Sequence, residues 1–173
     1  FFDDFTKHAW AYRELSLMMG MPPGRDSYPG DIFFLHSRMI ERAAQLNKKL
    51  GGGSMTFIPV VELLEGDLTS YIPTNLVSMT DGQLYLNASL FNEGFRPAVD
   101  VGLSVSRVGS KVQWKATKAV SRSTRMEFIQ FKELLRVSKL QASTQSEEAR
   151  KSLEAGKILQ ALLTQPASSP VPV

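Results

Sequence analysis

One arginine in this sequence lies on a run of short side chains. Arg107 is preceded by Ser104 and Ser106 and followed by Gly109, and the run follows an apolar strand that ends in Asp100-Val-Gly-Leu. Short side chains allow another surface or a ligand to approach the backbone closely. A guanidinium is always charged and holds its donors in one plane, which suits the oxygens of a transferring phosphoryl group. The residues alone are compatible with an arginine finger and also with an exposed arginine that has no role in chemistry.

Other kinds of site find little support in the sequence. There is no cysteine, which excludes disulfides, thiol catalysis and sulfur-ligated zinc. His8 and His36 lack the spacing of metal ligands and are expected to be ordinary helix residues. The pair Gly156-Lys157 lacks the upstream glycine of a phosphate-binding loop, so we do not expect this chain to bind a nucleotide by itself.

Composition and charge are typical of an ordinary folded domain. The 173 residues are 43% hydrophobic and 21% charged, which is enough to bury one core. The formal net charge is only +3 and the basic residues are spread among acidic ones, so no nucleic-acid partner is expected. No apolar run reaches the length that spans a bilayer. The first residues, Phe1 to Asp4, are typical of the end of a buried strand, and we therefore expect the chain to be a fragment of a larger subunit.

The elements that must position Arg107 alternate between helix and strand. With Thr6 as its N-cap, a helix is predicted over Ala9–Met19, and Gly20 ends it. A second helix is predicted over Asp31–Leu50, where consecutive glycines follow. Short apolar runs predict strands of a parallel sheet that is covered on both faces, and these runs are Met55–Leu64, Gln83–Leu86 and Ala98–Val105.

From about Val112 the pattern becomes helical again. Leu, Phe and Met recur at helical spacing in two stretches, which predicts two helices joined by a hydrophilic linker at Gln141–Glu148. These stripes are interpreted as core rather than as a ligand site. The proline-rich tail, residues 165–173, is expected to be extended or disordered.

Short blocks along the chain occur in the order in which they occur in the alpha subunit of the rotary F-type ATP synthase, which this sequence resembles. The match is expected to fade beyond about Leu135. The blocks are Asp3-Asp4, Pro22-Pro23-Gly24-Arg25, Tyr28-Pro29-Gly30-Asp31, Leu35-His36-Ser37-Arg38, Gly52-Gly53-Ser54, Ile72-Pro73-Thr74-Asn75, Thr80-Asp81-Gly82-Gln83 and the run from Ser104 to Gly109.

The resemblance implies an α/β fold in three parts. Residues 1–111 would be the second half of a RecA-like P-loop nucleotide-binding domain, a mostly parallel sheet with flanking helices. Residues 112–164 would begin an α-helical C-terminal domain, and residues 165–173 would be the tail. The chain would not be catalytic alone, since the catalytic site of the family belongs to the beta subunit.

The resemblance also implies roles for individual residues at that catalytic site. Arg107 matches the arginine that the alpha subunit supplies in trans, where a guanidinium neutralises charge on the γ-phosphate in the transition state. Ser78, Gly82 and Phe33 match residues near the same interface with beta.

A second, noncatalytic nucleotide site is implied as well. Arg96, Pro97 and Gln165 would line its adenine pocket, although Pro166 and Ala167 depart from the family pattern beside Gln165. Asp3 would orient Mg²⁺ through water. The cofactor would be ATP or ADP with Mg²⁺, bound only together with the missing N-terminal half that carries the phosphate loop. Two alternatives stay open: the acids beside Asp3 could cap a helix, and Arg96 could simply stabilise the fold.

The partners implied are the N-terminal piece of alpha, beta subunits, the central gamma stalk and a peripheral stalk, with the membrane reached only through the complex. The loop Met21–Gly30 would lie near the rotor stalk, or it is a rigid connection that needs no partner. We expect the matrix side of the mitochondrial inner membrane, although bacterial and plastid enzymes share these motifs. The alternative function is a degenerate, purely architectural fragment in which Arg107 is kept for packing.

Overall fold

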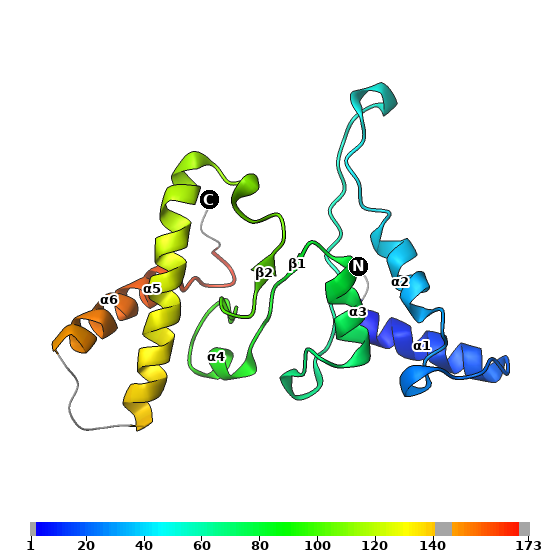
Figure 1. The fold of residues 1–173 in the computed structure, drawn as a ribbon, viewed down its shortest axis with the longest axis horizontal. Coiled ribbons are helices and arrows are strands. Elements are labelled where there is room, and N and C mark those ends of the chain that lie inside the picture. The colour runs from blue at the N-terminus through cyan, green and yellow to red at the C-terminus, as the bar shows by residue number, and fades with distance from the viewer. Residues whose placement is uncertain (1–2, 141–146, 170–173) are drawn as a thin grey trace. The chain divides into compact units, whose positions relative to one another are not determined.

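The computed structural model describes residues 3–140 and 147–169, which belong to two compact units, Phe1–Asp81 and Gly82–Val173. Figure 1 shows the elements of each unit as a ribbon. Within the described residues, no helix is both long enough and apolar enough to cross a membrane.

The α-helices among the described residues of the first unit are α1 (Phe5–Met18), α2 (Ile32–Ile40) and α3 (Tyr71–Met79). They bury one apolar cluster, whose members are Phe5, Ala9, Tyr28, Ile32, Ile40, Ile72 and Leu76. The N-cap of α1 is Asp4, whose carboxylate accepts a hydrogen bond from the backbone N–H of Lys7 at 3.0 Å. The prediction of Thr6 as the cap is therefore wrong. Thr6 lies inside the first turn, and its hydroxyl oxygen accepts from the backbone N–H of Glu62 at 2.9 Å.

The second helix is shorter than predicted. It ends at Ile40, and the chain then forms a projection with two arms and the 3-10 turn η2 (Lys48–Leu50) at its tip, drawn in cyan in Figure 1. The arms are joined by a bridge between Gln45 and Ser54 and by a bond from Leu46 N–H to the Gly53 carbonyl at 2.9 Å. Because these backbone groups pair across the projection, they are not available to continue the helix.

The predicted parallel sheet is not what the described residues form. The strands they contain are β1 (Gly82–Gln83) and β2 (Val105–Ser106), which pair in antiparallel orientation. An extended run becomes a strand only where its backbone meets a neighbouring strand. Residues 55–64 instead meet the start of α1, where Phe5 N–H donates to the Val60 carbonyl at 2.9 Å, and they end in the 3-10 turn η3 (Leu64–Gly66).

The second unit contains α4 (Ala88–Asn92), α5 (Lys115–Leu140) and α6 (Glu147–Leu163), and η4 (Gly109–Lys111) follows β2. Its core cluster consists of Leu90, Phe95, Ala98, Phe128 and Phe131. The prediction of two helices in the last third is confirmed. Of the predicted linker, residues 141–146 lie outside the described part, and Glu147 and Glu148 form the first turn of α6.

The tail is described only in part. Residues 165–169 are not helical and include a hydrogen bond from Ser169 N–H to the Pro166 carbonyl at 3.2 Å, while residues 170–173 lie outside the described part.

A glycine allows α5 and α6 to pack closely. Gly156 is buried within α6, and a Cβ atom added there would lie 2.0 Å from Cδ2 of Phe131 on α5. Real Cβ atoms do not approach another atom so closely, so the absence of a side chain at this position sets the distance between the two helices.

Candidate functional site

Arg107 directly follows the short strand pair of the second unit, and its side chain is exposed. In this pair Gly82 lies opposite Ser106, and Gln83 lies opposite Val105. A Cβ atom at Gly82 would lie 2.4 Å from the carbonyl oxygen of Val105. The absence of a Cβ atom at Gly82 therefore allows the close pairing, since only glycine admits the backbone of β2 at this distance.

Two serines that precede Arg107 bond to backbone groups near it. The hydroxyl oxygen of Ser104 accepts from Tyr85 N–H at 3.0 Å, and that of Ser106 accepts from Gly109 N–H at 3.1 Å. The short residues that the sequence suggested as room for a ligand thus have a second use. They fasten the segment that carries the arginine to neighbouring backbone groups.

An aspartate begins the turn that leads to this segment. One carboxylate oxygen of Asp100 accepts from Gly102 N–H at 2.9 Å and from Leu103 N–H at 3.3 Å, and the other pairs with the Lys132 ammonium at 3.2 Å. Burial raises the pKa of the Asp100 carboxyl, but the Lys132 ammonium and the two N–H groups outweigh burial and hold this pKa below its usual value. The carboxylate is therefore ionised at neutral pH.

Two predicted interface residues lie in the first unit. Ser78, on α3, is exposed, and its hydroxyl donates to the Asn75 carbonyl at 2.6 Å. Phe33, on α2, keeps 45% of its surface exposed. Both side chains reach the surface of their unit.

The structure brings together the residues predicted for the adenine pocket. Gln165 N–H donates to the Arg96 carbonyl at 2.9 Å, although the two residues lie far apart in the sequence. The Arg96 guanidinium donates to the carbonyls of Phe91 at 2.5 Å and Phe95 at 3.0 Å, and it stacks on the Phe91 ring with 3.5 Å to the centroid. These bonds satisfy carbonyls at the end of α4, which supports the fold-stabilising alternative for this side chain. Pro97, which follows Arg96, is exposed.

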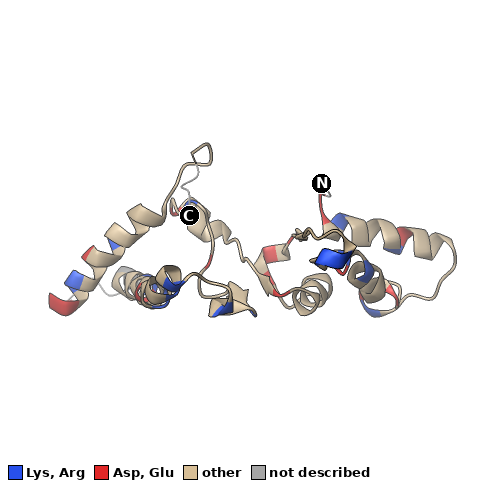
Figure 2. Ribbon diagram, turned by 90° about the horizontal axis from the view of Figure 1, so that it is seen from above, with Lys and Arg blue, Asp and Glu red and all other residues tan. Residues whose placement is uncertain are grey.

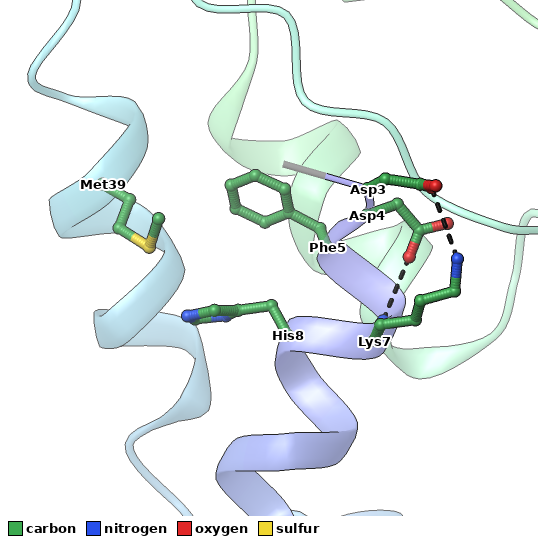
Figure 3. A pocket seen from close by; sticks show the side chains of 6 residues that line it. All are labelled: Asp3, Asp4, Phe5, Lys7, His8 and Met39. Atoms are coloured by element: carbon green, nitrogen blue, oxygen red, sulfur yellow. Dashed lines mark hydrogen bonds and ion pairs between the residues drawn. The ribbon is translucent and has the colours of Figure 1, made fainter. Parts of the chain in front are cut away.

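Asp3 and Asp4 have different surroundings, as Figure 3 shows. The Asp4 carboxylate is buried and caps α1, whereas the Asp3 side chain is 90% exposed and pairs with the Lys7 ammonium at 3.3 Å. The two aspartates line a pocket of about 200 Å³, together with Phe5, Lys7, His8 and Met39. Among the described residues, no group of three His, Asp or Glu side chains could hold a metal directly. The Asp3 carboxylate is exposed, and its predicted contact with Mg²⁺ through water stays a prediction.

A histidine pair is the feature that the sequence analysis missed. His8 Nδ1 lies 3.3 Å from Nε2 of His36, and His36 is fully buried. Burial, and secondly the charge that His8 can carry, lower the pKa of His36 to about 4. A signal was present, because His36 stands four residues from each of Ile32 and Ile40, at the spacing of one buried helix face.

Family models match nearly the whole chain. The ATP synthase alpha/beta family nucleotide-binding domain matches residues 1–106, and the C-terminal domain of the ATP synthase alpha/beta chain matches residues 113–173. The expectation that the likeness fades beyond about Leu135 is therefore wrong.

Curated relatives agree with these matches. ATP synthase subunit alpha of Dehalococcoides mccartyi strain 195 is 52% identical over 172 residues, which are 99% of this chain and 34% of that protein. The subunit of the same name from Clostridium botulinum strain Hall is 54% identical over 172 residues, with the same coverage. This chain thus spans about a third of the length of these relatives. Both organisms are bacteria, so the expected mitochondrial location finds no support in them. With two family models matching in sequence order and identity above one half along the chain, this protein belongs to the ATP synthase alpha/beta family.

Proposed function

We propose that this chain is part of the non-catalytic alpha subunit of a proton-driven ATP synthase and supplies Arg107 to the ATP site of a neighbouring beta subunit. The family and the identity with ATP synthase alpha subunits support the assignment. One structural observation carries the role of Arg107. It lies directly after a strand pair that closes tightly only because position 82 is glycine, on an exposed segment tied down by Ser104 and Ser106.

The proposed catalytic effect follows from the guanidinium of Arg107 and from the hydrogen-bonded segment that carries it. Negative charge grows on the transferring phosphoryl group, and a guanidinium held beside it stabilises that charge more in the transition state than in the bound nucleotide. Fingers of this kind are worth about a thousandfold or more in rate. Donors that are already ordered need no rearrangement during the reaction, which is what the bonded serines around Arg107 provide. Supplying the arginine from a neighbour links the chemistry to closure of the interface.

The same subunit would hold ATP or ADP with Mg²⁺ at its own noncatalytic site. The contact between Gln165 and Arg96 fits the adenine end of such a site, with Pro97 beside it, and the exposed carboxylate of Asp3 fits the magnesium end. The sequence contains no phosphate-binding loop, so the phosphates would be held by a part of the subunit that this sequence does not include.

The proposed partners are those of an alpha subunit in its complex. Beta subunits would cover Arg107, Gly82, Ser78 and Phe33, and the gamma stalk would pass near the loop Met21–Gly30. A peripheral stalk and the N-terminal part of alpha complete the set. The chain would reach a membrane only through this complex, and a bacterial membrane is compatible with the relatives.

Arg107→Ala and Arg107→Lys in the assembled complex test this function. We expect kcat for ATP hydrolysis to fall about a thousandfold in both variants, with the KM for ATP little changed, because the lost contact belongs to the transition state. Affinity for ADP with fluoroaluminate, which imitates the transferring phosphoryl group, should fall in parallel. Arg122→Ala, at an exposed arginine of α5, is the matched control. Normal turnover by an assembled Arg107→Ala complex would favour the purely architectural alternative.

A further inference from the structure

The turn Asp100–Ser104, which leads directly into β2 and Arg107, is held from one side by the segment that contains β1. Asp100 N–H donates to the Tyr85 carbonyl at 2.8 Å, and Tyr85 N–H donates to the hydroxyl of Ser104 at 3.0 Å. The Gln83 side chain also reaches the Leu103 carbonyl at 3.4 Å. These contacts hold the turn against the strand pair that it precedes.

The other side of the turn is held by two cations of α5. Lys132 pairs with Asp100 at 3.2 Å, and both side chains are largely buried, with 23% and 16% of their surfaces exposed. The Arg125 guanidinium donates to the carbonyl of Val101 at 3.1 Å and to that of Ser104 at 3.4 Å. Lys132 therefore fixes the start of the turn, while Arg125 spans it.

The face of α5 that presents these cations is anchored in the core. Arg125, Phe128 and Lys132 are three and four residues apart, so they lie along one stripe of the helix. Phe128 is 5% exposed and belongs to the core cluster, which Phe131 of the same helix also joins. A helix packed in this way cannot shift without disturbing the core, so the position of the turn is tied to the position of α5.

We propose that Lys132 and Arg125 are positioning residues that set the place of Arg107 through the turn Asp100–Ser104. The proposal rests on the proposed role of Arg107 in trans. Neither cation touches the reacting atoms; they act through the backbone that the turn shares with β2. Both residues lie in the segment matched by the C-terminal domain, whereas Arg107 follows the segment matched by the nucleotide-binding domain. Movement of the helical domain would therefore change the position of Arg107.

Kinetics of the assembled complex test the proposal. Misplacement of a catalytic group by about 1 Å can cost about a hundredfold in rate, so Lys132→Met should lower kcat by about tenfold to a hundredfold. The KM for ATP should change less than about twofold. Affinity for ADP with fluoroaluminate should fall by the same factor as kcat. Lys132→Arg keeps the charge and should restore kcat to within about threefold. Lys118→Met, at an exposed lysine of the same helix, is the matched control.

A second pair of variants covers the case in which Lys132→Met does not assemble because Asp100 is left without its partner. Asp100→Asn combined with Lys132→Met removes both charges together. Arg125→Leu removes two hydrogen bonds to backbone carbonyls and leaves no carboxylate without its ion-pair partner. This variant should lower kcat by about fivefold. Arg122→Leu is its control. Unchanged kcat in these assembled variants would overturn the proposal.

Combination with Arg107→Ala separates positioning from general damage. If Lys132 acts through the arginine, Lys132→Met should lower kcat by less than about twofold in an Arg107→Ala background. A further fall by the full tenfold would show a different route and overturn this proposal alone. Full activity of Arg107→Ala by itself would overturn the proposed function, and this proposal with it.

Discussion

The two units bury different kinds of side chain. Among the described residues, the four buried polar or charged side chains all lie in the first unit, and they are Asp4, Thr6, Ser16 and His36. The core cluster of the second unit is apolar, and Gly156 lies against Phe131 within it. Its charged pair, Asp100 and Lys132, is largely but not fully buried, with 16% and 23% of the two side chains exposed.

Because their cores differ in this way, the two units depend on different interactions for their stability. Each of these four side chains has a contact partner, as the Ser16 hydroxyl has in the Tyr12 carbonyl at 2.8 Å, but the buried Nδ1 of His36 has no hydrogen-bond partner. Such a core is sensitive to protonation and to the loss of single bonds. The core of the second unit is sensitive to volume, because its closest contact has no space for even one more carbon atom. Figure 2 shows that both signs of charge occur along the ribbon, so the difference concerns the cores rather than the overall charge.

The largest effect is expected from adding one methyl group to the second unit. Alanine in place of an exposed helical glycine stabilises by up to about 1 kcal/mol, but Gly156→Ala should destabilise by about 3 kcal/mol, since its Cβ would overlap Phe131. Hydrogen exchange of α5 and α6 measures the loss, with peptides of the first unit as an internal control. Phe131→Leu should partly restore protection in the double variant. If Gly156→Ala protects these helices better than the unchanged chain, the packing argument is wrong.

A change of pH should affect the first unit most. The pKa of His36 is lowered from 6.5 to about 4, so the folded state favours the neutral ring. The stability it contributes is complete above pH 6.5 and is lost as the pH falls toward 4, by an amount on the order of 3 kcal/mol. Urea unfolding followed by Trp10 fluorescence, in a Trp114→Phe background, measures the first unit by itself.

The control for this pH effect is His36→Phe, which should show a flat stability over the same window. In the second unit the pKa of Asp100 is lowered from 3.8, so its carboxylate stays ionised between pH 6.5 and 4 and hydrogen exchange of α5 should not follow the acid loss. An equal loss in both units would count against a specific role of His36.

The partly buried ion pair should have an intermediate effect. Asp100→Asn keeps an oxygen acceptor for the turn but removes the charge that faces Lys132, and it should destabilise the second unit by about 1.5 kcal/mol. Because the pair is mostly shielded, the loss should persist in about 0.5 M salt. Chemical denaturation at low and high salt measures both quantities. Complete rescue by salt would mean that solvent screens the pair as it does at an open surface.

The smallest effect is expected at the start of α1. Asp4→Ala removes the cap and should cost about 1 kcal/mol, whereas Asp3→Ala removes only an exposed pair and should cost nothing measurable. Hydrogen exchange in the first turns of α1 distinguishes the two variants. A larger loss for Asp3→Ala would show that its contact with Lys7 was underestimated.

Local features of this fold could be predicted from the sequence, and contacts between distant segments could not. The helical spacing of apolar residues located α1, α5 and α6, and the alternative of capping by an acid near Asp3 is confirmed at Asp4. The helices α3 and α4 are short and were missed, since a few residues carry too little periodicity.

Several contacts that shape the candidate site join residues that are far apart in the sequence. Asp100 meets Lys132 from another element, and no local pattern marks either residue. The run at residues 55–64 has the composition of a strand, but its pairing depends on which backbone lies beside it, which composition does not specify. The resemblance placed Gln165 and Arg96 at one pocket, but the hydrogen bond between them was not predicted.

The pairing of Gly82 with β2 also fixes the register of the two strands. Side chains alternate between the two faces of a strand, so sliding β2 by one residue would turn Arg107 to the opposite face. A pair of two-residue strands has few bonds with which to resist such sliding. The Val105 carbonyl oxygen occupies the space that a Cβ atom at Gly82 would fill. Any other register of the two strands would set that carbonyl against a residue with a side chain. One absent carbon atom thus favours the register that sets the face of the strand pair to which Arg107 is directed.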